Sequence, residues 1–382
     1  MTPAGTVIGA TMVVNHGADV DHFVLVVVAE GFTAAEQAAF ETAVDDFLAV
    51  LQATAPYDDP GVWQRINVYR LDVHSTQSGA DNPLACADDP AGYVPLPPEV
   101  AGTYFDAEFC TGGIRRLLTL GEKAQLLLDL DTYVPAWDAV VVAVNHLEYG
   151  GSGDGANNIA VYSLDALASQ IAVHELGHAL DLADEYDAGG PDTYAGAEPP
   201  DPNVTTDVTA AKWASFVTTA NLPTWSSSDC AVSNEGVADP EPGAVGLYEG
   251  AAYSRCGIYR PMNDCYMRHL GIPFCVVCEA HIRDYLATAF PSDTSGCFVA
   301  SAVYADPGHP DVEVLRRWRD RRLEPGARGR WAMVLVAGVY RRLGPACGNF
   351  TRPRRRLAAV LRRLLFAPAA AMLRRGEARR RR

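Results

Sequence analysis

The segment HELGHALDLADEY, residues 174–186, contains the residue types and spacing of a zinc-dependent hydrolase. On a helix, His174 and His178 would lie one turn apart on the same face, so that both imidazoles could bind one metal ion. Glu175 would point about 100° away, near enough to accept a proton from a water molecule without binding the ion itself. We therefore predict a zinc site in which the two histidines are ligands and Glu175 is the general base.

The third ligand has to come from the acidic residues that follow the histidines, which are Asp181, Asp184, Glu185 and Asp187. If the helix continued, Glu185 would lie roughly 16 Å along the helix axis from His174, too far to share an ion. If the helix instead ends near Leu180, a turn brings Asp184 beneath the two imidazoles. Asp181 would occupy that turn, and aspartate tolerates a left-handed backbone better than most residues. This reasoning favours Asp184 as the third ligand and leaves Glu185 to support the site without binding the ion.

The segments upstream of this motif predict a mixed α/β sheet flanked by helices. Residues 23–29 and 138–145 are apolar runs typical of strands that are buried on both faces, and residues 66–73 are predicted to form a further strand. The shorter segment 157–163 follows a glycine-rich stretch and is predicted to be an edge strand, with Ser163 capping the helix that carries the motif. An extended peptide could pair with this edge strand and so be aligned over the metal.

A helix is predicted directly after the first strand, whereas the region after the motif is predicted to consist of long loops. Thr33 and Glu36 have the spacing of a capping box. The apolar face of the helix that follows contains Phe40, Val44, Phe47, Leu48 and Leu51. Residues 187–245, in contrast, are rich in Gly, Pro, Asp, Thr and Ser, and they predict at most a short helix near 210–217.

The charge of the chain is distributed unevenly. The 382 residues have a net charge of −16, but the 21 arginines and 6 acidic residues after residue 298 give that segment +15. The remaining 10 basic and 41 acidic residues give residues 1–298 a net charge of −31. Because phosphate repulsion would dominate, this acidic part argues against nucleic-acid binding.

Nine cysteines indicate disulfides and an oxidising compartment. Cys86 and Cys110 form a plausible local pair. Cys256, Cys265, Cys275 and Cys278 could instead form a four-thiolate zinc site, but the wide spacing of the first two favours disulfides here as well. We expect a secreted or cell-surface bacterial protein, although no signal peptide is visible in the sequence.

The motif HELGHALDLADEY resembles that of the metzincin peptidases, which have a methionine-containing turn beneath the metal. This resemblance implies such a turn in the stretch GIYRPMNDCYMRHL, where Met267 is a better candidate than Met262. Tyr259 or Tyr266 in the same stretch could stabilise a developing oxyanion, although packing in the core is an equally good explanation for a tyrosine. The spacing of Asp184, six residues after His178, is that of the metzincin peptidases, with Asp in place of their third His.

Several motifs in the right order resemble the IgA-peptidase family of zinc metallopeptidases. They are HELGHALDLADEY, GLYEGAAYSRCGIYRPMNDCYMRHL, PFCVVCEAHI, VVVAEGFTAAEQAAF and STQSGADNP, and together they run from about residue 20 to residue 288. The resemblance implies a metzincin-like catalytic domain. It also implies His174, His178 and Asp184 as zinc ligands, Glu175 as the base and Met267 in the turn.

Residues 297–323 resemble a segment that begins CFIATAAYG in many bacterial proteins and is often named as a sorting-type tail. The sequence beyond it is basic and apolar, a pattern of helices that lie on anionic membrane surfaces, although a solvated tail explains it about as well. We therefore expect three parts: an N-terminal extension over 1–20, a catalytic domain over 21–290 and an Arg-rich helical tail over 291–382.

These observations predict a zinc-dependent endopeptidase that acts on protein or peptide substrates. Two other functions remain open, a surface-binding module that no longer cleaves and a zinc amidase that acts on cell-wall substrates. The intact set of His174, Glu175 and His178 disfavours the binding module, because binding alone has no need of a general base. Acidic residues between 154 and 187 could also bind Ca²⁺, although they lack the spacing of an EF-hand.

Overall fold

The computed structural model describes residues 4–187 and 190–290. The Arg-rich segment 291–382 and the segment that resembles a sorting-type tail lie outside the described residues. Residues 17–22, which contain a 3-10 turn over Asp19–Asp21, belong to a second compact unit. The fold below concerns residues 4–16 and 23–290. No helix among the described residues is long and apolar enough to cross a membrane.

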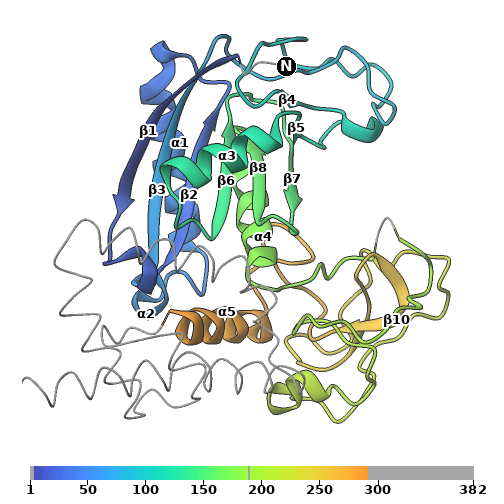
Figure 1. The fold of residues 1–382 in the computed structure, drawn as a ribbon. Helices are drawn as coiled ribbons and strands as arrows, with labels where there is room; N and C mark the ends of the chain where they lie inside the picture. The colour runs from blue at the N-terminus through green and yellow to red at the C-terminus, as the bar shows by residue number, and fades with distance from the viewer. Residues whose placement is uncertain (1–3, 188–189, 291–382) are drawn as a thin grey trace, which may run out of the picture. The chain divides into compact units, whose positions relative to one another are not determined.

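A six-stranded mixed sheet forms the centre of the fold, with the strand order β1-β3-β2-β6-β8-β7 (Figure 1). Its strands are β1 (Gly5–Val14), β2 (Phe23–Glu30), β3 (Ile66–Ser75), β6 (Ala139–Val144), β7 (Gly151–Asp154) and β8 (Ile159–Ser163). The four central strands are parallel, and β1 and β7 are antiparallel to their neighbours. Every residue of β2 and β6 is buried, as their apolar runs predicted. The mixed sheet expected from the sequence is confirmed.

Both edges of the sheet differ from the sequence prediction. The segment 157–163 was predicted as an edge strand, but its strand β8 lies between β6 and β7. The glycine-rich strand β7, with the sequence GSGD, forms that edge instead. At the other edge, β1 lies within the segment that was expected to be an N-terminal extension, and it pairs with β3. The reason is that neither edge strand has the continuous apolar run by which buried strands are recognised.

Two helices on one face of the sheet support the motif. The helix α1 (Gln37–Ala53) follows a 3-10 turn over Ala34–Glu36, and the predicted capping box is present. It packs against α4 (Ser169–Ala179), the helix that contains both histidines, and α4 lies along β7 and β8. Figure 1 shows α3 (Lys123–Tyr133) across the other face of the strands. Ser163 does not cap α4, because it ends β8 and α4 begins six residues later with Ala168 at its N-cap; its hydroxyl instead accepts a hydrogen bond from the Gly150 N–H.

The rest of the unit consists mainly of loops. Short elements interrupt them: α2 (Pro60–Trp63), β4 (Ala107–Glu108), a 3-10 turn over Thr111–Gly113, β5 (Thr119–Leu120) and a 3-10 helix over Ala211–Phe216. The last of these is the short helix predicted near 210–217. A hairpin of β9 (Tyr248–Ala251) and β10 (Ser254–Arg260) follows, and α5 (Val276–Ala289) ends the described chain.

The cysteine prediction is correct in part. Cys86 and Cys110 form the predicted disulfide, and Cys256 pairs with Cys230. The prediction of disulfides for Cys265, Cys275 and Cys278 is wrong, because these three residues are buried free thiols. The four-thiolate site is excluded too, since the sulfur of Cys256 is used in a disulfide.

Candidate metal centre

The turn after α4 brings the acidic residues back to the histidines. The helix ends at Ala179, and Asp181 has a φ of 65°, in the left-handed region that the sequence analysis required there. The Asp181 N–H donates to the His178 carbonyl, and the Leu182 N–H donates to the Gly177 carbonyl. This pair of bonds is the Schellman motif, which closes a helix C-terminus and reverses the chain.

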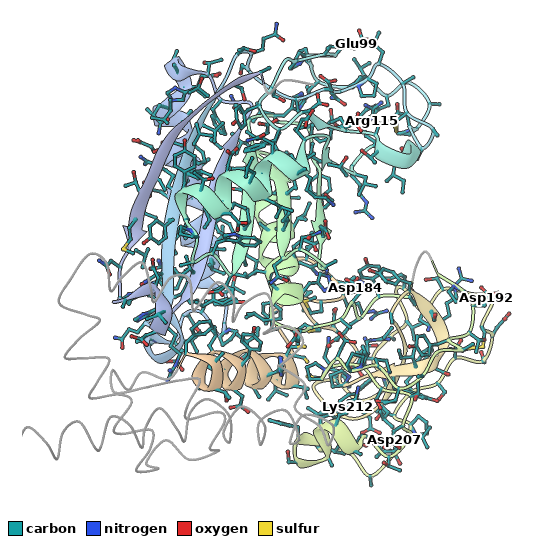
Figure 2. The ribbon with its side chains drawn as sticks, in the orientation of Figure 1. Glu99, Arg115, Asp184, Asp192, Asp207 and Lys212 are labelled. Atoms are coloured by element: carbon teal, nitrogen blue, oxygen red, sulfur yellow. A yellow bond between two sulfur atoms is a disulfide. The ribbon has the colours of Figure 1, made fainter. Side chains whose placement is uncertain are left out.

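His174, His178 and Asp184 meet at the end of α4, where Figure 2 labels Asp184. Asp184 Oδ1 lies 2.9 Å from His174 Nε2 and 3.3 Å from His178 Nε2. Ligands at the usual zinc–nitrogen and zinc–oxygen distances of about 2.0–2.2 Å are roughly 3.3 Å apart in a tetrahedral site. The three side chains therefore have the separation that one zinc ion requires.

The backbone fixes the orientation of both imidazoles. His174 Nδ1 lies 3.1 Å from the Tyr266 carbonyl oxygen, and His178 Nδ1 lies 2.7 Å from the Leu182 carbonyl oxygen. Since a carbonyl can only accept, both Nδ1 atoms must carry hydrogen, which leaves the Nε2 lone pairs of the neutral rings free. Both lone pairs face Asp184, so the donor set fits a divalent ion.

Asp184 and His178 carry opposite charges when no ion is bound. Burial alone would raise the pKa of Asp184, but hydrogen bonds from His174 and His178 outweigh it and hold this pKa well below its usual range. Burial would likewise lower the pKa of His178, but the hydrogen bond and charge of Asp184 raise it to about 9. A carboxylate is thus kept ionised in a buried position, as a metal ligand must be.

Glu175 lies beside the three candidate ligands, between α4 and the sheet edge. Its Oε2 is 3.7 Å from His178 Nε2, and burial raises the pKa of its carboxyl above the usual range. On its other side it contacts Gly153 of β7, where a Cβ would overlap the carboxylate. Glu175 is therefore held between the histidines and the edge strand, as a general base for a substrate at that edge would be.

Met267 forms the floor of the centre. It is fully buried, and its sulfur lies against Gly177, where a Cβ would come within 2.6 Å of it. The Met267 carbonyl accepts a hydrogen bond of 2.8 Å from the Glu185 N–H. The turn that contains Met267 is thus connected both to the histidine helix and to the chain beside Asp184.

Two tyrosines at the centre differ from those that the sequence analysis proposed. The hydroxyl of Tyr253 donates a short hydrogen bond to Asp184 Oδ2, and the ring of Tyr186 stacks 6.4 Å from that of His174. Tyr253 and Ala252 form the two-residue turn of the β9–β10 hairpin, both with positive φ. The N–H groups of this strained turn donate to the carbonyls of Asp184 and Tyr186, which holds Tyr253 against the centre.

The proposed oxyanion residues have other surroundings. The ring of Tyr266 stacks on Phe274 at 4.9 Å, and only the backbone carbonyl of Tyr266 reaches His174. Tyr259 pairs through its backbone with Thr205, and its hydroxyl bonds to Ser226. Sequence reasoning missed Tyr253, and the positive φ of its turn had no Asn-Gly or Asp-Gly signal.

Comparison with known proteins places this geometry in a family. The family model described as IgA Peptidase M64 matches residues 12–237 and 233–286, which is most of the chain. A separate comparison with curated proteins finds no match. The matched residues include α4, the turn at Asp181, the hairpin with Tyr253 and the Met267 turn. The chain therefore belongs to the IgA Peptidase M64 family and is a metallopeptidase.

Proposed function

We propose that this metallopeptidase is a zinc-dependent endopeptidase whose zinc ligands are His174, His178 and Asp184. The observation that carries the proposal is the convergence of two imidazole Nε2 atoms and one carboxylate oxygen next to a second, non-ligating carboxylate. Two histidines and an acidic residue are a common catalytic zinc set, which leaves one coordination position for water or substrate.

The protein's own groups supply proton transfer and positioning. Zinc, when bound, supplies a Lewis acid that polarises the scissile carbonyl and acidifies a water molecule. Glu175 accepts the proton of the attacking water and delivers it to the leaving amine. Tyr253 keeps Asp184 in place through its hydroxyl.

The outer edge of β7 supports pairing with an extended peptide. The backbone of Gly151 already bonds outwards, to Arg116 and Leu118. Backbone groups alternate in direction along a strand, so Gly153 is the next residue whose N–H and C=O point away from β8. Gly153 also contacts Glu175. A peptide paired here would thus bring a carbonyl next to the base. An open hollow of about 530 Å³ beside β7 and β8, lined partly by Leu117, Leu120 and Val161, could accept one of its side chains.

Export from a bacterial cell is part of the same proposal. The structure has two disulfides, which persist in oxidising compartments and are rare in the bacterial cytosol. An exported peptidase would encounter secreted or surface-exposed proteins as substrates. Contact of the basic tail with a membrane surface, and binding of Ca²⁺, stay predictions.

Glu175→Gln tests the function, because it removes the base and keeps the shape of the side chain. We expect kcat/KM on a peptide library to fall about 10²- to 10⁴-fold with the zinc content unchanged. Glu41→Gln on the exposed face of α1 is the control, and it should cleave like the parent protein. Full activity in Glu175→Gln would disprove the role of the base. Binding without cleavage by the parent would support a binding module, and cleavage of cell-wall peptides alone would support an amidase.

A further inference from the structure

A second cluster of metal-binding side chains lies next to the catalytic candidate. It consists of Glu185, Cys265, Cys275 and Cys278, whose ligand atoms all lie within 4.8 Å of one another. All four residues are buried, and the most exposed of them, Cys275, is only 4% exposed. None of the four has a role in the proposed catalysis. The cluster therefore needs an explanation of its own.

The sulfur separations suit a metal ion better than a disulfide. Cys265 Sγ and Cys278 Sγ are 3.7 Å apart, and Cys278 Sγ is 3.2 Å from Glu185 Oε1. Two sulfurs at about 2.3 Å from a tetrahedral zinc are ~3.8 Å apart. A disulfide would need about 2.0 Å, a distance that both disulfides elsewhere in this chain do approach.

The carboxylate of Glu185 has an unused oxygen. Its Oε1 accepts hydrogen bonds from Asn203 Nδ2, at 2.9 Å, and from the Cys278 thiol. Its Oε2 is buried and has no hydrogen-bond partner among the described residues. A buried charged oxygen without a partner is unfavourable, so such groups are rare unless an ion or water satisfies them.

Several neighbouring groups would stabilise the thiolates once an ion is bound. The N–H of Cys275 donates to Cys265 Sγ at 3.2 Å, and the N–H of Cys278 donates to Cys275 Sγ at 3.4 Å. Cys275 caps the N-terminus of α5, where the helix dipole stabilises anions. The guanidinium of Arg260, which is 1% exposed, interacts with the charge of Glu185. These groups offset the excess negative charge that three thiolates and one carboxylate would leave around a divalent ion.

We propose that Glu185, Cys265, Cys275 and Cys278 form a second, structural Zn²⁺ site. All four side chains would bind in their deprotonated forms, three as thiolates and one as a carboxylate, and would release the protons that they hold to solvent. All four positions of a tetrahedral ion would be taken by protein, so this site has no place for water or substrate. Such closed sites stabilise a fold and do not catalyse.

The second ion would fix the floor of the catalytic centre. Cys265 lies two residues before Met267, and the N–H of Glu185 donates to the Met267 carbonyl. Between them, the carbonyl of Tyr266 accepts from His174. A zinc ion that joins Glu185 to Cys265 would therefore hold the turn on which the orientation of His174 depends.

Metal analysis and cobalt spectroscopy of the full chain test this site separately from activity. We expect two zinc ions per chain by elemental analysis. Replacement by Co²⁺ should give an intense near-ultraviolet charge-transfer band from thiolate to cobalt, which a centre of histidine and aspartate cannot produce. Cys278→Ser should lose this band and one ion. His178→Ala, the matched control, should lose the other ion and keep the band.

Four results would overturn the proposal. The first two concern the parent protein: a single ion per chain without a thiolate band, or iron in place of zinc at the cluster. The third is a thiolate band that survives in Cys278→Ser. The fourth is a disulfide among the three cysteines in mass spectra of unreduced protein. The band and the mass spectra are measured on the parent chain, so they decide the matter even if Cys278→Ser fails to fold. Failure of the endopeptidase proposal would leave the thiolate band and the mass spectra unchanged.

Discussion

Asp184 and Glu185 are neighbours in the chain, yet each belongs to a different cluster with a different character. Asp184 joins two imidazoles beside the free edge of the sheet, where the side chain of His178 is 18% exposed. Glu185 joins three thiols in a place where every ligand is buried. One cluster keeps room for a reactant, and the other is closed on all sides. A single peptide bond thus separates the proposed catalytic centre from the proposed structural site.

The comparison also shows how one turn serves both clusters. The chain reverses at Asp181, and the five following residues run beneath α4 without forming a helix. Outside a helix, adjacent side chains can point to opposite sides. The backbone between the clusters is held by the Tyr253 turn on one side and by Met267 on the other. Variants at these positions should therefore separate the two clusters, and their expected effects differ in size.

The largest difference in activity is expected when each of the two adjacent acidic residues, Asp184 and Glu185, is replaced separately. Asp184→Ala should lower kcat/KM on the order of 10³-fold and remove the catalytic ion, because it deletes a ligand. Glu185→Gln should keep the catalytic ion and lose less than about tenfold in activity, because its carboxylate acts only through the Met267 turn. Elemental analysis and peptide hydrolysis measure both. Loss of the catalytic ion in Glu185→Gln would show that the two clusters do not bind their ions independently.

The second-largest effect on activity is expected at the edge strand β7. Gly153→Ala would push the Glu175 carboxylate out of place, and we expect kcat to fall about 10²-fold with both ions retained. Gly155→Ala, directly after the end of β7, is a matched control. Its added Cβ would meet only His178 Cβ, at an ordinary 3.7 Å, so activity should stay within about twofold. Equal activity in the two variants would contradict the placement of the base.

A smaller effect is expected at the hairpin. Tyr253→Phe removes the hydroxyl that binds Asp184 Oδ2, and loss of such a bond to a ligand costs about 10- to 100-fold in metal affinity or activity. Chelator competition and steady-state kinetics measure the two quantities. Tyr194→Phe is the control, because the hydroxyl of Tyr194 bonds only to the Ala197 carbonyl in a loop. Unchanged zinc affinity and unchanged kcat in Tyr253→Phe would remove that residue from the centre.

The smallest effect is expected at the turn itself. Asp181→Gly should change the free energy of unfolding by less than about 1 kcal/mol and keep both ions, because glycine adopts a φ of 65° freely. Asp181→Val should destabilise the chain by about 1–3 kcal/mol, since a β-branched residue is strained there. Urea unfolding measures both. Equal stability of the two variants would mean that the left-handed turn is not retained in solution.

Local signals were enough to predict the centre of the fold and the ligands expected from the motif. The buried parallel strands have apolar runs, and the capping box of α1 depends on residues three positions apart. The place of Asp184 followed from helix geometry, because the helix had to end before the chain could return. Each of these features is decided within about ten residues of sequence.

The remaining features depend on contacts between distant segments. The strand β7 has no apolar pattern and is a strand only because β8 pairs with it. The hairpin turn at Ala252 and Tyr253 lacks the usual glycine and is held by backbone bonds to residues near 184. Cys230 and Cys256 pair because the loops bring them together. Cys265, Cys275 and Cys278 consequently remain thiols and cluster with Glu185.

The bond between His174 Nδ1 and the Tyr266 carbonyl has a consequence for biosynthesis. Its two partners are 92 residues apart in the chain. A ribosome that has translated the whole histidine helix has therefore not yet made the group that selects the metal-binding tautomer of His174. The same holds for Tyr253 and Met267. The proposed centre is thus incomplete until the segment that contains Tyr266 has emerged and folded.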